Sequence, residues 1–326
     1  MPLAMKASQL VTSTALMMSL ALIAALATNF GGLFPGNVLT PSRRSDLTII
    51  ILAGMLTVSL SRIPARDLNP VSNWRSVLRA VFFGLVLSSL IPLAGYLALR
   101  GTEYGDQAMG LVFIAATPFA ASVTPLSYIL NGDMEHAARG TIIVYTVSLV
   151  WIPFIVWLAL GELVDMRDVV LTVAKVIGVP LALSRLFTRV DIPRGLMAAV
   201  LNCCIFALVW LSVGSTNFGV AAWVFAAFAA VAALRSFGLG DAVELADRRA
   251  GISWGQRVTD ILMASYKNKG IAIALCMAVL APRGLAADAM VAIATSIVVE
   301  ILWVIFMDSV LFGRRRMERE TAAGFA

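Results

Sequence analysis

Apolar residues occur along this chain in long uninterrupted runs rather than in short amphipathic stripes. Each run of about 17 to 27 residues is long enough to cross the roughly 30 Å hydrocarbon core of a bilayer as a helix. Short polar, glycine- or proline-containing stretches separate the runs. The pattern therefore predicts an all-α membrane protein with ten transmembrane helices, at residues 9–33, 47–63, 76–99, 107–130, 137–161, 168–186, 195–216, 218–236, 257–280 and 287–312.

The composition agrees with this prediction. Hydrophobic residues make up 60% of the chain, charged residues 13%, and the mean hydropathy is +0.89, far from the balance of a soluble domain. The first run could also be a cleavable signal peptide, since Lys6 precedes it and Ala25-Leu26-Ala27 fits a cleavage site. Because the run continues past Ala27 to Leu33, we expect a transmembrane helix there.

The positive charges predict an orientation. Most of the 25 lysines and arginines fall in loops on the side of the N-terminus, and positive loops tend to stay in the cytoplasm. Both termini are therefore expected in the cytoplasm, with the protein in the cell (inner) membrane. The pI near 9.6 then reflects topology, and we expect no nucleic-acid partner. The basic residues on this side include Arg62, Arg66, Arg75, Arg79, Arg185, Arg189, Arg194, Arg248, Arg249 and Arg314 to Arg316.

A short acidic loop at residues 162–168 divides the chain into two sets of five spans, at residues 1–163 and 164–326. An odd number of spans in each half places the second half upside down in the membrane relative to the first. This is the arrangement of inverted-repeat transporters, whose substrate and ion sites lie near the midplane where interrupted helices meet.

The fourth span of each half carries helix-breaking residues. Pro118 and Pro125 each remove a backbone donor from the first of these spans, and the second contains a polar stretch that ends at Gly270. Irregular backbone at membrane depth is tolerated only where it is buried in protein or lines a cavity. We therefore expect two unwound segments that face each other.

The polar stretch in the ninth span is the strongest functional signal. Lys267 and Lys269 flank Asn268 within an apolar run, and Glu300 lies deep in the tenth span. Charge within a membrane is costly and usually marks a transport pathway, a relay or a bound ion. The sequence therefore favours transport. It contains no paired metal-ligand motif and no nucleophile motif with a histidine at membrane depth, so we expect neither a resident metal nor an enzyme.

Three sequence stretches together resemble the bile acid:sodium symporter family, including its bacterial members and their pantothenate-transporting relatives. GMLTVSL at residues 54–60 is similar to the second-span signature of that family, TPFAASVTPLSYILNGD at residues 117–133 to its fourth-span crossover, and KNKGIAIAL at residues 267–275 to its ninth-span pattern. The resemblance implies ten spans in two inverted repeats. It also implies a panel of spans 1, 2, 6 and 7 and a core of spans 3 to 5 and 8 to 10.

The positions that hold sodium in the resembled symporters are mostly changed here. The resemblance implies oxygen ligands from a glutamate, a glutamine and serine, asparagine and threonine side chains. At the corresponding positions stand Met263, Lys267, Val123, Thr124 and Ala137. Only Thr141 and Asn268 keep the expected type. Because a hard cation needs several oxygen ligands, ordinary sodium binding is doubtful.

We hypothesise that the Lys267 ammonium replaces the sodium. An ammonium on a flexible stem can occupy a cation site made of carbonyl and hydroxyl oxygens, as a fixed counter-ion for an anionic substrate or as a group that loads and releases a proton. Its candidate partners are Asp260, seven residues earlier on the same face, and Glu300. Lys269 is expected to be structural. His136, the only histidine, is expected at the surface in a short cytoplasmic turn.

These observations predict a secondary transporter that moves a small organic anion by alternating access, with proton coupling or none. Sodium-coupled symport through an altered ion site and a transport-dead sensor or scaffold stay open as alternatives. Arsenite carriers are distant relatives of the resembled family and have a cysteine in the fourth span. Residues 115–117, at the corresponding place, contain no cysteine, so an arsenite carrier is disfavoured. The substrate, the direction of transport and the oligomeric state stay open. The residues expected to form the substrate and ion site are Ser122, Thr124, Ser127, Thr141, Asp260, Lys267, Asn268 and Glu300.

Overall fold

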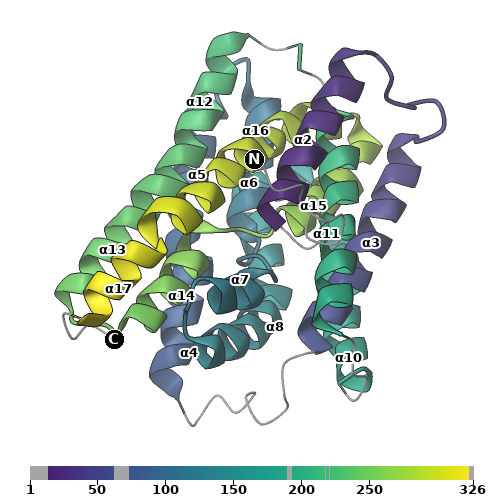
Figure 1. Ribbon diagram of the computed structural model, residues 1–326. Helices are drawn as coiled ribbons and strands as arrows, with labels where there is room; N and C mark the ends of the chain where they lie inside the picture. The colour runs from purple at the N-terminus through teal and green to yellow at the C-terminus, as the bar shows by residue number, and fades with distance from the viewer. Residues whose placement is uncertain (1–13, 62–72, 189–192, 217, 220, 323–326) are drawn as a thin grey trace, which may run out of the picture.

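The computed structural model describes residues 14–61, 73–188, 193–216, 218–219, 221 and 222–322 (Figure 1). Within these residues the chain is helical almost throughout. Lys6, Arg62, Arg66 and Arg189, which contributed to the predicted orientation, lie outside the described residues.

The described part of the first half contains six spanning or partly spanning elements. They are α2 (Thr14–Phe30), α3 (Pro41–Ser61), α4 (Trp74–Val81) continued through the π-helical turn Phe82–Leu87 into α5 (Ser88–Leu99), α6 (Gly105–Ala116), α7 (Val123–Ile129) and α8 (Met134–Leu160).

The second half follows the same succession. Its elements are α9 (Met166–Val173) continued through a π-helical turn into α10 (Val179–Leu186), α11 (Arg194–Val213), α12 (Ala222–Ala233) continued likewise into α13 (Leu239–Arg249), α14 (Trp254–Ser265), α15 (Lys269–Leu280), α16 (Ala286–Phe306) and α17 (Arg314–Ala322).

Seven of the described helices are long and apolar enough to cross a bilayer, which makes the chain a multi-pass membrane protein. Each of the ten predicted runs contains helix, although the runs that hold α6 and α15 are divided by breaks. The inverted relation between the two halves stays a prediction. The seven helices are Pro41–Ser61, Trp74–Leu99, Met134–Leu163, Met166–Leu186, Gly195–Val213, Ala222–Arg249 and Ala286–Leu311.

One predicted boundary is wrong. The eighth span was expected to end at residue 236, where the apolar run stops, but the helix continues as α13 to Arg249. α13 is amphipathic and buries Leu239, Val243 and Asp247 against the protein. Hydropathy marks the part of a helix that lies in lipid, whereas burial against neighbouring helices extends it further.

The helices form two packed groups. α2 packs on α11, while α3 packs on both α10 and α11, and Figure 1 shows these helices together on one side of the molecule. α6 packs on α5 and α16, α12 packs on α16, and α13 packs on α14. We call the first group the panel and the second group, with α4, α7, α8 and α15, the core.

A close helix crossing in the core depends on a glycine. A Cβ atom on Gly110 of α6 would lie 2.0 Å from the carbonyl oxygen of Ala289 in α16. Gly110→Ala is therefore expected to destabilise the protein by about 1–3 kcal/mol through overpacking, seen as a lower melting temperature in detergent. Gly54→Ala in α3, where a Cβ would meet nothing within 4 Å, is the matched control. Equal melting temperatures for the two variants would contradict the close crossing.

Candidate functional site

The two interrupted spans meet where their helices are broken. α6 ends at Ala116 and α7 begins at Val123, while α14 ends at Ser265 and α15 begins at Lys269. The extended segments between them pair in antiparallel fashion: the Ala120 amide donates to the Tyr266 carbonyl at 2.9 Å. The Asn268 amide donates to the Pro118 carbonyl at 2.8 Å. This pairing supplies partners for backbone groups that the broken helices leave free.

Of the residues predicted to break these helices, only Pro118 lies in a break. Pro125 lies in the first turn of α7, and Gly270 lies in the first turn of α15. Proline is tolerated in a first turn because amides there have no partner within the helix. Both residues therefore mark the start of the second helix rather than the unwound segment itself.

We call the place where the two extended segments pair the crossing. Lys267 lies at its centre, in the segment between α14 and α15. Its side chain is 1% exposed, and its Nζ donates to three backbone carbonyls: Thr117 at 2.5 Å, Ala115 at 3.2 Å and Gly84 at 3.3 Å. The Ser89 hydroxyl lies 3.5 Å from the same Nζ. A buried ammonium is stable only when its hydrogens find such acceptors.

Local backbone irregularity makes this set of carbonyls available. Gly84 belongs to the π-helical turn Phe82–Leu87, and Ala115 is near the end of α6, where helical carbonyls lose their partners. A Cβ atom on Gly84 would lie 2.5 Å from the Phe119 ring, so the turn lies tightly against the crossing. Ser89, one turn later, also donates to the Ala115 carbonyl at 2.5 Å.

Glu300 of α16 is the acidic partner of the crossing. Its Oε1 accepts from Lys269 Nζ at 2.7 Å, from the Lys267 amide at 3.2 Å and from Arg235. Arg235 also donates to the Ser265 carbonyl at 2.8 Å, which is the last residue of α14. The carboxylate therefore joins both flanks of the α14–α15 break to α12, α13 and α16.

Arg235 was not identified from the sequence. It is buried, and it lies within the apolar run 218–236, so a charged residue at membrane depth was the available signal. Lys269 was expected to be structural. It pairs with Glu300, as a structural residue would, but it also lines a cavity beside the crossing.

A cavity of about 700 Å³ lies beside the crossing, between the panel and the core. Apolar side chains of α2, α3 and α11 form its panel wall. On the core side, Ser122, Asn268 and Glu300 line it together with both lysines. The apolar lining comprises Met18, Met55, Leu201, Ile205, Leu208, Val209, Ile273 and Ile297.

The other predicted site residues have separate surroundings. Asn268 caps α15, accepting from the Ile271 amide at 3.0 Å and donating to the Tyr145 hydroxyl at 2.7 Å. Thr124 and Thr141 contact each other at 3.1 Å between their hydroxyls. Ser127 is buried and accepts from the Thr259 hydroxyl at 3.3 Å.

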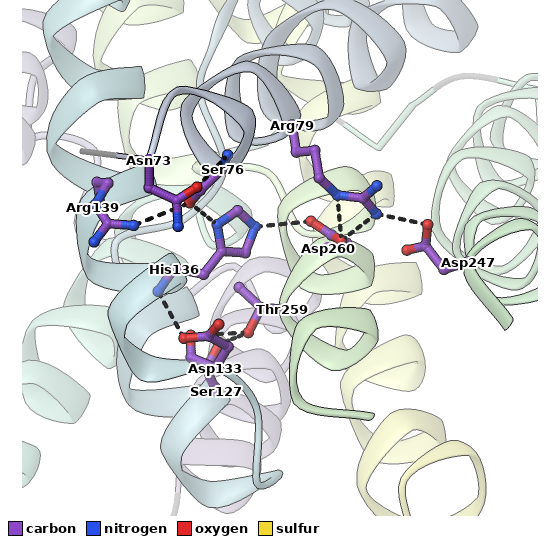
Figure 2. A network of polar contacts seen from close by, with 10 residues as sticks. All are labelled: Asn73, Ser76, Arg79, Ser127, Asp133, His136, Arg139, Asp247, Thr259 and Asp260. Atoms are coloured by element: carbon purple, nitrogen blue, oxygen red, sulfur yellow. Dashed lines mark hydrogen bonds and ion pairs between the residues drawn. The ribbon is translucent and has the colours of Figure 1, made fainter. Parts of the chain in front are cut away.

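Asp260 and Lys267 do not form an ion pair in the structure. Asp260 is fully buried, and its carboxylate contacts Arg79 and His136 instead (Figure 2). The predicted surface position of His136 is wrong: the side chain is 3% exposed and lies between Ser76 and Asp260. Asp133 caps α8 through the His136 amide, so His136 belongs to a helix rather than to a turn. Its ring is thereby directed into the protein.

The model of the Sodium Bile acid symporter family matches residues 47–233, more than half of the chain. The chain belongs to this family. Members of this family are membrane transporters, and the apolar helices of this chain agree with that class of protein. None of the curated proteins compared with the chain matches it. The family assignment agrees with the resemblance at residues 54–60 and 117–133, whereas residues 267–275 lie outside the matched range.

Some of the positions at which the family resemblance implied sodium ligands hold buried apolar side chains, and another holds a lysine. Met263 is fully buried. Its terminal methyl group packs closely on Gly140, where an added Cβ atom would lie only 2.5 Å away, so the apolar side chain of Met263 fills the space at this position. Val123 is also buried. The Lys267 amino group lies against the carbonyl oxygens of Gly84, Ala115 and Thr117, and carbonyl oxygens are the kind of ligand that a hard metal cation prefers.

Proposed function

We propose that this protein is a secondary transporter that moves a small organic anion by alternating access between the panel and the core, without the sodium coupling of its family. In this proposal its ten spans form two inverted repeats in the cytoplasmic membrane, with both termini in the cytoplasm. The observation that carries the proposal is the position of Lys267 Nζ among the carbonyls of Gly84, Ala115 and Thr117.

The charges beside the cavity support an anionic substrate. Arg235 and Lys269 pair with the Glu300 carboxylate, and Lys267, whose backbone amide donates to the same carboxylate, adds a third basic side chain beside the cavity. When all four are ionised, the cluster carries an excess of two positive charges. Charges taken out of water need counter-charges, and an anion in the adjoining cavity would supply one.

The surroundings of Lys267 and Lys269 suggest different roles for the two side chains. Lys267 Nζ has acceptors on the backbone of two elements and is held in place. Lys269 Nζ donates to the Glu300 carboxylate, and its side chain is 10% exposed beside the cavity. We propose that Lys267 is the fixed substitute for the metal cation and that Lys269 faces the substrate.

Uptake by the purified protein in proteoliposomes tests this proposal. Labelled organic anions are offered with an inward sodium gradient alone or an inward proton gradient alone. We expect uptake that does not respond to sodium, because Lys267 occupies the cation position, and protein-free liposomes give the background. Sodium-driven uptake would overturn the proposed loss of sodium coupling. No uptake of any anion under either gradient would favour the transport-dead alternative.

A further inference from the structure

A second charged network lies toward the far end of α14 from the crossing. Asp260 accepts from Arg79 Nε at 3.0 Å and Nη2 at 2.6 Å through Oδ2. Its Oδ1 lies 2.9 Å from His136 Nε2. Arg79 Nη2 also donates to Asp247 Oδ1 at 2.7 Å. Figure 2 shows these side chains in one row, contributed by α4, α8, α13 and α14.

The network lacks one positive charge. Arg79 is a single cation between the two carboxylates of Asp247 and Asp260, which leaves one negative charge when His136 is neutral. The remaining charged groups beside the network are two cations, Arg75 and Arg139, and two anions, Asp133 and Glu135. Arg139 pairs with Glu135, Asp133 caps α8 through the His136 amide, and exposed Arg75 lies over the Trp74 ring. A proton on His136 would therefore neutralise the set, and a buried set of charges favours neutrality.

The hydrogen bonds of His136 suit both of its charge states. Nδ1 lies 2.6 Å from the Ser76 hydroxyl, and Nε2 faces Asp260. A neutral ring donates a hydrogen bond from Nε2 to the carboxylate and accepts a hydrogen bond from the Ser76 hydroxyl at Nδ1. A charged ring donates from both nitrogens. Because the hydroxyl hydrogen rotates, Ser76 serves as donor in the first state and acceptor in the second. The ring gains a proton without losing a hydrogen bond.

Protons from water can reach this group. A basin of about 900 Å³ is lined by Ser76, Arg79, His136 and Arg139, and its exposed lining residue Glu135 shows that it opens to the surface. The basin lies at the N-terminal ends of α4 and α8, on the side predicted to be cytoplasmic. Histidine is the side chain whose charge ordinarily changes between pH 5 and 8.

We propose that the His136–Asp260 pair is a proton-binding site, and that the proton it takes is the one coupled to transport. This inference rests on the proposed function. α14 connects Asp260 to the crossing, since the helix runs from Trp254 to Ser265 and the extended segment that holds Lys267 follows it directly. Protonation changes the charge of a network that joins four helices of the core, and so it biases which arrangement of the core is favoured.

The titration can be observed directly because His136 is the only histidine. In the full-length protein with ¹⁵N-labelled histidine in lipid nanodiscs, every imidazole signal belongs to His136. We expect the signals to change from the neutral to the doubly protonated form within pH 5–8. Asp260→Asn removes the carboxylate that faces Nε2, so a pH response identical to that of the wild type would show that Asp260 takes no part in the proton site. A ring that keeps one form across this range would overturn the proton site.

Transport measurements test the coupling. With the anion that the wild type transports, His136→Gln should lose the stimulation by an inward proton gradient while anion exchange at equal pH continues, since exchange requires no net proton movement. A merely structural role would lower both activities together and overturn the coupling. Lys175→Gln, at an exposed lysine, should change neither activity.

Two further outcomes separate this inference from the proposed function. If the wild type transports no anion, the proposed function fails, and the NMR titration still decides the proton site. If His136→Gln does not fold, Ser76→Ala keeps the histidine and removes its Nδ1 partner. Loss of gradient stimulation in that variant would support the coupling, and unchanged stimulation would contradict it.

Discussion

Uptake of the anionic substrate should fall by a factor of ~100 or more when Lys267 is replaced by glutamine. The substitution removes a fixed positive charge beside the cavity and leaves the carbonyls of Gly84, Ala115 and Thr117 with fewer donors. Removing a buried charge that pairs with a bound ligand costs about 2–5 kcal/mol of binding free energy, and each 1.4 kcal/mol corresponds to a factor of ten. Initial uptake rates in proteoliposomes measure the effect.

The control for this experiment is Lys175→Gln, which makes the same chemical change at an exposed lysine of the panel. Melting temperatures of both variants show whether the crossing stays folded. A folded Lys267→Gln protein with wild-type uptake would contradict the role of the ammonium as a substitute for the metal cation. Sodium-dependent uptake that appears only in Lys267→Gln would instead show that the remaining oxygens still bind sodium once the lysine is gone.

The sequence was sufficient to predict a multi-pass helical membrane protein and the two apolar runs in which the helix is interrupted. Long apolar runs report directly on bilayer depth, and a proline or a polar stretch within such a run has few structural explanations. Lys267 was recognisable for the same reason, since a lysine in the middle of an apolar run is costly. Arg235 carried the same signal at the edge of its run but was not recognised.

The acid–base network around Asp260 could not be predicted in the same way. His136 and Asp260 are 124 residues apart in the chain; His136 lies in the first turn of α8, where polar residues are common, and Asp260 lies in the middle of α14. Their contact depends on how α8 and α14 pack, which periodicity alone does not determine. The same reason explains Ser127, whose hydroxyl contacts Thr259 of α14 rather than the cavity.

The groups that surround Lys267 Nζ could not be predicted from the sequence either. Ser89 donates to Ala115 and lies near Lys267, but a serine in an apolar helix usually bonds to its own preceding turn. Backbone carbonyls such as that of Gly84 carry no residue-type signal at all. A site made of main-chain oxygens becomes visible only when the crossing geometry is known.

α14 connects the two charged clusters of the core. Arg235 and Glu300 hold its C-terminal end and the crossing, while Arg79 and His136 hold Asp260 in its middle. A change of charge at either cluster alters the packing partners of the same helix. In the proposed mechanism, proton binding at one cluster and anion binding beside the other would therefore act on one element, which couples the two sites.

Loss of the Glu300 carboxylate should destabilise the protein strongly. In Glu300→Gln three cations, Arg235, Lys267 and Lys269, lie close together without their common counter-charge. Leaving buried charges without a partner costs about 3–5 kcal/mol, so we expect a melting temperature well below that of the wild type and a reduced yield of folded protein. The melting temperature in detergent is the measurement.

A double-mutant cycle identifies the cation that makes Glu300 necessary. Lys269→Gln combined with Glu300→Gln removes one positive and one negative charge, so the pair should recover part of the lost stability, with a coupling of about 0.5–3 kcal/mol. Arg235→Gln combined with Glu300→Gln should recover more, because Arg235 is more deeply buried than Lys269 and also donates to Ser265 in the same cluster. Lys175→Gln combined with Glu300→Gln should recover nothing. If the stability losses are strictly additive in all three pairs, the charge of Glu300 does not hold the cluster together. The stability lost in Glu300→Gln then comes from packing.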